Sequence, residues 1–283
     1  MAAKFVNVPH AAGLGEGPVW DSKSGCVYWV DIPAGSVLRT QLATGTTDVL
    51  WSSPEPATSV ALTDRGTVLV SLMERVVELA DDGTVRVAAD VASMPEGFRL
   101  NDCGVDPNGG YWVGSLNHQG LNRSGLYKLT SAGTFTKVLS DVTIANGMDW
   151  SPCGRWMYFV DSAVRVVWRF AFDLKSGMIS SRTGQPMSVD RWGGEPDGLW
   201  VDSEGAIWIA LWDGGSLLRF SRWDDSKPDV ITVPGARPTS GAFVGPLLDR
   251  LFLTMAGQGD DTVPAVVLSG LGVGRLPSRV KSF

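Results

Sequence analysis

Short runs of β-branched and aromatic residues recur along the whole chain, bounded by Gly, Asp, Asn and Pro. Apolar residues at helical spacing are nearly absent. Runs of this kind are typical of strands that are separated by tight turns. The pattern therefore predicts an all-β protein.

Six segments of similar sequence repeat along the chain. Each has an apolar residue, a polar turn that is usually closed by Gly, and a β run. The apolar residues, called anchor residues here, are Trp20, Leu62, Val105, Trp150, Val201 and Val244. Successive anchor residues are 42, 43, 45, 51 and 43 residues apart. A period of about 40 to 50 residues with four strand-sized pieces is typical of a propeller blade. The sequence thus predicts a six-bladed β-propeller, formed by residues 1–283 as one domain, with the anchor residues starting the inner strands.

The first repeat shows the four predicted strands most clearly, at residues 17–20, 26–31, 36–41 and 46–51. The sixth repeat becomes irregular toward the C-terminus, so residues 4–8 are expected to supply its outer strand and close the ring. Stacked blades bury both faces of each sheet, and the 12 tryptophans are expected to pack between them.

An oxygen-bearing side chain stands four residues before each anchor residue. The six residues are Glu16, Thr58, Asn101, Asn146, Asp197 and Ser240. Equivalent positions in propeller blades are related by rotation, so residues just before the inner strands should meet at one mouth of the central channel. Carboxylate and amide oxygens suit a hard divalent cation such as Ca²⁺.

Local structure offers a second interpretation of each of these residues. Turn entrances favour Asp, Asn, Ser and Thr, whose side chains form hydrogen bonds with the nearby backbone. Thr58 and Ser240 are short and neutral, and we expect them to support the cation's ligands or to line the channel rather than to bind the cation directly.

The composition argues against several classes of function. The net charge is −6 and no run of Lys or Arg forms a basic patch, so neither nucleic acid nor an anionic membrane is an expected partner. The three cysteines, Cys26, Cys103 and Cys153, form neither a disulfide framework nor a CxxC zinc motif. The N-terminus lacks a signal-peptide core and no apolar stretch is long enough to span a bilayer, which predicts a cytoplasmic protein.

Histidine chemistry is also restricted, because the chain has only His10 and His118. HExxH and three-histidine zinc sites need more histidines, and a Ser-His-Asp triad would depend on one of these two. Nucleotide-binding glycine motifs are absent from the sequence. Hydrolytic chemistry is therefore expected to use carboxylates, amides and a metal.

Five segments together carry a specific resemblance. They are residues 15–20 (GEGPVW), 99–102 (RLND), 145–152 (ANGMDWSP), 196–198 (PDG) and 238–240 (PTS). In this order they resemble the senescence-marker-protein/gluconolactonase family, which includes regucalcin and bacterial sugar lactonases. The resemblance covers almost the whole chain.

The resemblance implies a six-bladed propeller with one divalent cation and hydrolysis of a small-molecule sugar lactone. Ca²⁺ is the first choice of cation, with Zn²⁺, Mn²⁺ or Mg²⁺ as alternatives. Carried over residue by residue, Glu16, Asn146 and Asp197 match the metal ligands. Asp197 also matches the general acid/base, while Arg99 and Asn101 match the groups that hold the lactone.

Two departures leave the substrate open. The family often has Cys after Pro-Thr-Ser, where this chain has Gly241, and residues 115–119 (SLNHQ) differ from the family's loop. Hydrolysis of another ester, such as an aryl ester or a phosphotriester, is an alternative that a Trp- and Leu-lined pocket would favour. A non-catalytic calcium-binding propeller is the third possibility.

Overall fold

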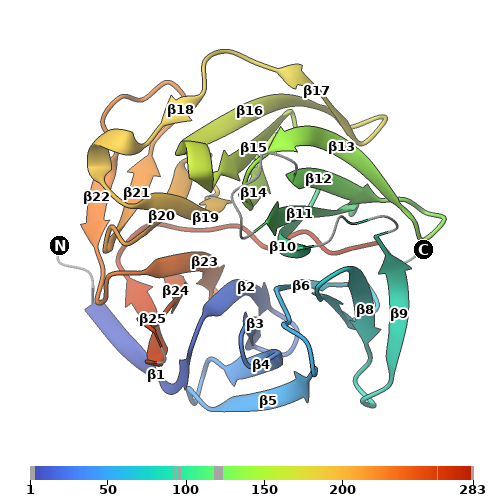
Figure 1. Ribbon diagram of the computed structural model, residues 1–283. Coiled ribbons are helices and arrows are strands. Elements are labelled where there is room, and N and C mark those ends of the chain that lie inside the picture. The colour runs from blue at the N-terminus through green and yellow to red at the C-terminus, as the bar shows by residue number, and fades with distance from the viewer. Residues whose placement is uncertain (1–3, 92–93, 95–96, 118–123, 260, 282–283) are drawn as a thin grey trace.

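The computed structural model describes residues 4–91, 94, 97–117, 124–259 and 261–281. Six antiparallel sheets surround a central axis, so the predicted all-β six-bladed propeller is confirmed (Figure 1). Within these residues the only helical elements are the 3₁₀ turns η1 (Ser162–Val164) and η2 (Asp190–Trp192). No helix of the described ranges has the length and hydropathy needed to cross a membrane.

Each of blades one to five begins with its innermost strand and proceeds outward. Blade one contains β2 (Gly15–Asp21), β3 (Cys26–Asp31), β4 (Ser36–Gln41) and β5 (Thr47–Ser52), and blade two contains β6 (Ser59–Leu62), β7 (Val68–Ser71), β8 (Arg75–Leu79) and β9 (Val85–Asp90). Blade three contains β10 (Phe98–Val105), β11 (Tyr111–Asn117), β12 (Ser124–Leu129) and β13 (Phe135–Val142). Blade four contains β14 (Ala145–Trp150), β15 (Trp156–Asp161), β16 (Val166–Asp173), β17 (Met178–Arg182) and the short β18 (Met187–Ser188). Blade five contains β19 (Glu195–Val201), β20 (Ile207–Trp212), β21 (Ser216–Phe220) and β22 (Asp229–Thr232).

The sixth blade closes the ring. It contains β23 (Pro238–Val244), β24 (Arg250–Met255) and β25 (Val263–Ser269), and its outer strand is β1 (Lys4–Ala12). β1 pairs antiparallel with β25, with Phe5 opposite Leu268. The expected closure by the N-terminal segment is therefore confirmed, and the four strands of the first repeat also lie where the sequence predicts them.

The anchor residues lie at the ends of the inner strands, so the prediction that they start these strands is wrong. Trp20 is the penultimate residue of β2, and Leu62 and Val105 are the last residues of β6 and β10. The polar turn after each anchor residue leads the chain into the second strand of its blade. An apolar residue followed by such a turn therefore marks where an inner strand ends.

Buried side chains form six clusters, each between two neighbouring blades. Trp112 and Trp150 join blades three and four with ring centroids 6.0 Å apart. Trp208 and Phe243 join blades five and six at 5.7 Å. Aromatic pairs in such geometry contribute about 0.5–1.5 kcal/mol each beyond burial. The predicted packing of tryptophan between blades is confirmed at these positions.

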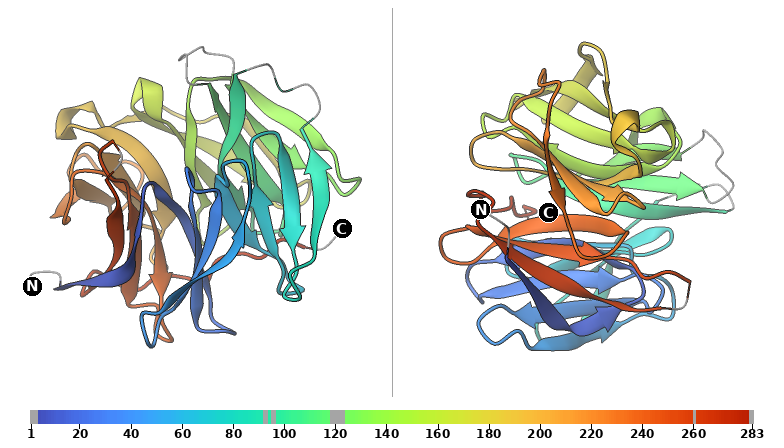
Figure 2. Two further views of the ribbon diagram at one scale, coloured as in Figure 1. Left: turned by 60° about the horizontal axis from the view of Figure 1, so that its bottom comes forward. Right: turned by 90° about the vertical axis from the view of Figure 1, so that its left-hand side faces the viewer.

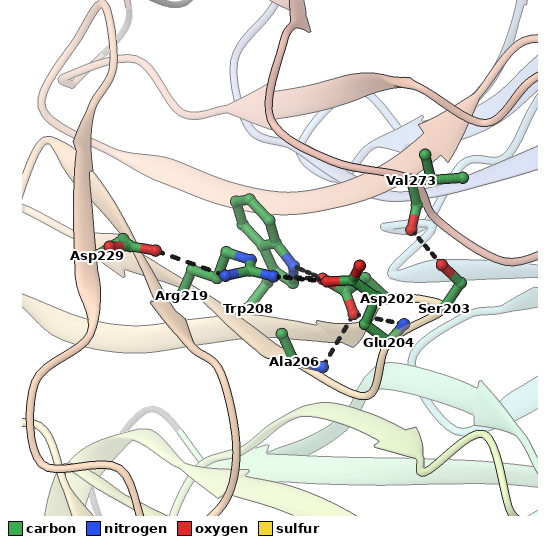
Figure 3. Close-up of polar contacts among 8 residues, drawn as sticks. All are labelled: Asp202, Ser203, Glu204, Ala206, Trp208, Arg219, Asp229 and Val273. Atoms are coloured by element: carbon green, nitrogen blue, oxygen red, sulfur yellow. Dashed lines mark hydrogen bonds and ion pairs between the residues drawn. The ribbon is translucent and has the colours of Figure 1, made fainter. Parts of the chain in front are cut away.

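A buried carboxylate organises the hairpin between β19 and β20 (Figure 3). Asp202 Oδ1 accepts hydrogen bonds from the backbone N–H groups of Glu204 and Ala206, at 3.0 and 2.9 Å. Its Oδ2 accepts from Trp208 Nε1 at 3.0 Å and lies 3.5 Å from Arg219 Nη2. Blade three repeats the arrangement with Asp106, Trp112 and Lys128. A buried charge is tolerated here because it is hydrogen-bonded and paired.

The chain after β25 crosses the ring beneath the ends of the inner strands (Figure 1). We call residues 271–281 the C-terminal strap. Arg275 Nη2 donates to the carbonyl oxygen of Trp150 at 2.7 Å and its Nε to that of Val201 at 3.2 Å, which links blades four and five. Arg279 Nη1 donates to the Thr63 carbonyl oxygen at 3.2 Å, and Nη2 pairs with Asp21, which links blades two and one. The side views show the strap at one face of the ring (Figure 2).

Candidate metal and ester-binding site

The inner strands are irregular where the oxygen-bearing residues lie. The register of β2 shifts between Glu16 and Val19, and equivalent shifts occur in β10, β14, β19 and β23. A β-bulge leaves a residue out of the ladder and turns its side chain in a new direction. The oxygen-bearing residues were expected just before the inner strands, but of these six described residues only Thr58 lies there, directly before β6. The other five lie inside the strands, because pairing begins before the bulge.

One pocket of about 170 Å³ is lined by all five residues singled out for chemistry, which are Glu16, Arg99, Asn101, Asn146 and Asp197. They come from β2, β10, β14 and β19 and can share a pocket only because the ring is closed. The remaining lining residues are Leu14, Ile32, Leu116, Ile144, Ser162, Glu195, Pro196 and Trp212.

Thr58 and Ser240 do not line this pocket. Thr58 Oγ1 donates to the carbonyl oxygens of Ser71 and Asn101, at 3.3 and 3.2 Å. Ser240 lines a second cavity of about 150 Å³, which Gly17, Asp102 and the C-terminal strap also line. Ser240 therefore lines a cavity between the inner strands, whereas Thr58 connects the backbones of blades two and three.

A chain of hydrogen bonds orients the two amides of the pocket. Arg99 Nη1 donates to Asn101 Oδ1 at 2.8 Å, and Asn101 Nδ2 donates to the Ala145 carbonyl oxygen at 2.8 Å and to Asn146 Oδ1 at 2.6 Å. Both N–H groups of Asn101 are thus in use, and its Oδ1 keeps one lone pair. Asn101 can offer a substrate an acceptor but no donor in this arrangement.

Ser162 fixes the orientation of Asn146. Ser162 Oγ donates its single hydrogen to the Pro196 carbonyl oxygen at 2.5 Å, so it must act as an acceptor toward Asn146 Nδ2 at 2.8 Å. Asn146 Oδ1 is thereby turned away from Ser162 and keeps a lone pair beyond its bond from Asn101.

Two carboxyls of the pocket, those of Glu16 and Asp197, are buried close to each other. Burial raises the pKa of Glu16 well above its usual range, and the like charges of Asp197 and Asp102 add to this effect. Burial likewise raises the pKa of Asp197, with a further rise from Asp102, although a hydrogen bond with Glu16 works in the opposite direction. Burial lowers the pKa of Arg99 to about 10, against the opposing effect of both carboxylates, so its guanidinium remains charged at neutral pH.

Asp102 is a third carboxyl near the pocket, and it lies on the channel side. Burial raises its pKa to about 6, and its only opposing interaction is a hydrogen bond from the Cys103 N–H at 2.8 Å. Glu195, which also lines the pocket and adds to the rise in the pKa of Asp197, is a fourth acidic group, and Arg99 is the one basic residue in the pocket's described lining. This imbalance favours binding of a further cation.

A divalent cation fits the donor set. Glu16 and Asp197 supply two carboxylates, and Asn146 supplies an amide oxygen whose direction is fixed. Oxygen donors of these types suit Ca²⁺, Mg²⁺ or Mn²⁺. In the ranges that the structure describes, no three Asp, Glu, His or Cys side chains are grouped to hold a metal, so the set depends on the amide of Asn146.

The histidines take no part in the described pocket. His10 lies in β1, where its ring meets Trp29 edge-on at 5.8 Å. His118 and Gln119, at the end of the unusual segment 115–119, lie outside the described residues.

Sequence reasoning missed several residues of the site. Ser162, Asp102 and Trp212 have no counterpart among the six equivalent positions, so the repeat gives no signal for them. Asp102 belongs to the segment 99–102 that carries part of the family resemblance, and its position beside Asn101 could have indicated that it lies near the site.

Comparisons with known proteins identify relatives of this chain. Pentonolactonase XacC of Haloferax volcanii is 35% identical over 248 residues, which cover 88% of this chain and 83% of the relative. A luciferin-regenerating enzyme has the same fold with a TM-score of 0.92 and 26% identity, covering 99% of this chain and 100% of the other. The regucalcin of Agrobacterium tumefaciens, described as a calcium-binding protein, superposes with a TM-score of 0.87 and 27% identity, covering 98% and 97%.

Residues 14–257 match the family described as "SMP-30/Gluconolactonase/LRE-like region". This span contains every residue of the candidate pocket, from Leu14 to Trp212. The expected resemblance is confirmed, and the chain belongs to the SMP-30/gluconolactonase/LRE-like family.

Proposed function

We propose that this protein hydrolyses a lactone with the help of one divalent cation held by Glu16, Asn146 and Asp197. The observation that carries the proposal is the meeting of two buried carboxyls, an oriented amide and the Arg99 guanidinium in one pocket. Relatives named pentonolactonase and sugar lactone lactonase support lactone hydrolysis. The relative described as calcium-binding supports Ca²⁺ as the cation.

The chain's own residues have separate tasks in ester hydrolysis. A bound divalent cation would supply polarisation of the ester carbonyl and charge stabilisation. Asp197 takes a proton from the attacking water as the new C–O bond forms, and returns it to the ring oxygen as the ring C–O bond breaks. The product is a hydroxy acid, and Asp197 returns to the ionised form in which it began.

Arg99 and Asn101 are assigned to substrate binding. The Arg99 guanidinium is buried and charged, so it can donate hydrogen bonds to substrate oxygens in a fixed direction. The remaining Oδ1 lone pair of Asn101 can accept a hydrogen bond from a substrate hydroxyl.

A second candidate is hydrolysis of another ester, such as an aryl ester or phosphotriester. The apolar side chains of Leu14, Leu116 and Trp212 in the pocket favour it. Initial rates for a panel of lactones, an aryl ester and a phosphotriester, each with Ca²⁺, Zn²⁺, Mn²⁺ or Mg²⁺, distinguish the candidates. Hydrolysis of a lactone that is abolished by Asp197→Asn is the expected result. Cation binding without hydrolysis of any ester would favour a non-catalytic calcium-binding protein.

A further inference from the structure

The pocket is lined by polar and by apolar side chains, and Glu195 lies opposite Trp212 in the ladder between β19 and β20. Its polar side chains, Glu16, Asn101 and Asp197, are almost fully buried near the axis. Its apolar side chains come from blades one, three, four and five and form what we call the apolar collar. The apolar collar consists of Leu14, Ile32, Leu116, Ile144 and Trp212. A reacting ester held at the polar end would therefore direct its other substituents toward hydrocarbon.

Hydrogen bonds to an aspartate hold the backbone of the collar at equivalent positions in two blades. In blade one, Asp31 accepts hydrogen bonds from the N–H groups of Gly13 and Leu14, both at 3.2 Å. In blade four, Asp161 accepts from those of Thr143 and Ile144, both at 3.1 Å. Leu14 and Ile144 each stand two residues before a proposed ligand, so one carboxylate fixes a collar residue and the approach to a ligand together.

Trp212 is the largest member of the collar, and its ring is braced from outside the pocket. The Arg237 guanidinium lies 5.0 Å from the centre of the indole ring. Arg237 is itself held, because its Nε donates to Asp213 Oδ1 at 2.6 Å and its Nη1 to the Gly257 carbonyl oxygen at 3.1 Å. Trp212 lies outside the six buried clusters of the described chain, so packing between blades does not explain this bracing.

A rigid apolar surface such as the apolar collar distinguishes hydrocarbon from hydroxyl substituents of a substrate. A hydrocarbon group placed against it leaves water and gains free energy. A hydroxyl placed against it loses its bonds to water, and the collar side chains offer no partner in return. The nearby carboxylate of Glu195 is paired with the Arg165 guanidinium, 3.7 Å away. One methylene group in an apolar pocket changes specificity by about 10-fold or more.

On the basis of the lactone hydrolysis proposed above, we infer that the preferred substrate is a lactone with an alkyl or deoxy edge rather than a fully hydroxylated one. Trp212, with the Arg237 guanidinium against its ring, is the main specificity-determining residue.

The test compares kcat/KM for γ-octanolactone and D-xylono-1,4-lactone, which have the same ring size, with cation present. The wild-type protein is expected to prefer γ-octanolactone by at least about 10-fold. Trp212→Ala should raise KM for γ-octanolactone about 10-fold with little change in kcat, and should alter kcat/KM for the hydroxylated lactone less than about 3-fold. Trp212→Phe should restore most of the loss.

Trp168→Ala is the matched control, because Trp168 also lies against an arginine, Arg182 at 4.1 Å, but on β16, the third strand of blade four, away from the pocket. It should leave both kcat/KM values unchanged. A wild-type preference for the hydroxylated lactone, or equal losses on both lactones in Trp212→Ala, would overturn the inference while leaving lactone hydrolysis intact. Failure to hydrolyse either lactone would contradict the proposed function itself.

Discussion

Ser162 Oγ accepts a hydrogen bond from Asn146 Nδ2 at 2.8 Å while it donates its own hydrogen to the Pro196 carbonyl oxygen. The hydroxyl therefore decides which end of the Asn146 amide faces the pocket. Blade four thus supplies both a proposed ligand and the group that orients it.

Ser162→Ala should weaken the cation site although Ser162 is not a proposed ligand. Loss of the hydroxyl leaves Asn146 Nδ2 without its acceptor and frees the amide to rotate. Partners of metal ligands typically affect metal affinity by about 10- to 100-fold. Calorimetric titration of chelator-treated protein with Ca²⁺ measures this effect. Ser180→Ala, on the exposed edge strand β17, is the control and should bind Ca²⁺ as the wild type does. Equal affinity in Ser162→Ala would show that Asn146 needs no such support.

Arg99→Ala should separate substrate binding from cation binding. The guanidinium is charged and lines the pocket together with the carboxyls of Glu16 and Asp197, so its loss should lower kcat/KM for a lactone by about 10²-fold or more. Affinity for Ca²⁺ should stay within about threefold, because Arg99 donates no electron pair to a cation. Steady-state kinetics and Ca²⁺ titration on the same preparations test this, with the exposed Arg222→Ala as control. Parallel losses of both properties would show that Arg99 holds the site together instead.

Asp102→Asn should make the metal-free protein more stable at high pH. The pKa of Asp102 is raised to about 6 in the folded state, compared with about 3.9 in an unfolded chain. The folded state therefore holds the proton more tightly, and stability falls as pH rises from about 4 to 6. Asn cannot ionise and still accepts the Cys103 N–H. The variant should match the wild type near pH 4 and exceed it at pH 8 by as much as about 3 kcal/mol.

Urea unfolding of chelator-treated proteins at both pH values measures this difference. Asp249→Asn, on the exposed turn before β24, is the control. A difference that is the same at pH 4 and pH 8 would contradict the assigned ionisation.

Arg275→Ala should destabilise the ring without changing the chemistry of the pocket. Arg275 connects blades four and five from the C-terminal strap, at the opposite end of the inner strands from the candidate site. Its loss removes hydrogen bonds from the carbonyl groups of two buried residues, Trp150 and Val201, and removes the ion-pair partner of Asp149, at a cost of about 1–3 kcal/mol. Thermal unfolding should show a lower Tm than wild type, whereas kcat/KM of the folded enzyme at 25 °C should be unchanged. The exposed Arg155→Ala should alter neither quantity.

Rotational repetition explains how much of this structure could be predicted from sequence. The period gave the six blades, and the offset of four residues gave Glu16, Asn101, Asn146 and Asp197. The family resemblance added Arg99. A repeat reports only what its copies share, however, so Ser162, Asp102 and Trp212 could not be found in this way. None of these three residue types is repeated at the matching position of the other blades, and the role of each residue depends on contacts with a neighbouring blade.

Backbone irregularity is the second limit of the sequence. The bulges place Glu16 and its counterparts inside the inner strands, and an extra unpaired residue leaves no mark in an apolar-polar pattern. The anchor residues were assigned to the wrong ends of these strands for a related reason. Hydrophobic pattern locates a strand, but its ends depend on where the ladder of hydrogen bonds stops.

Cation dependence is the central claim, and titration of activity after chelation tests it most directly. Wild-type protein is treated with chelator until metal analysis shows none, and lactone hydrolysis is then measured against added Ca²⁺, Zn²⁺, Mn²⁺ or Mg²⁺. Activity should be lost on chelation and return with one cation per chain. Asn146→Ala should need more cation to recover, whereas Asp197→Asn should bind cation more nearly as wild type does yet stay inactive. Full activity in wild-type protein shown to be free of metal would contradict the account.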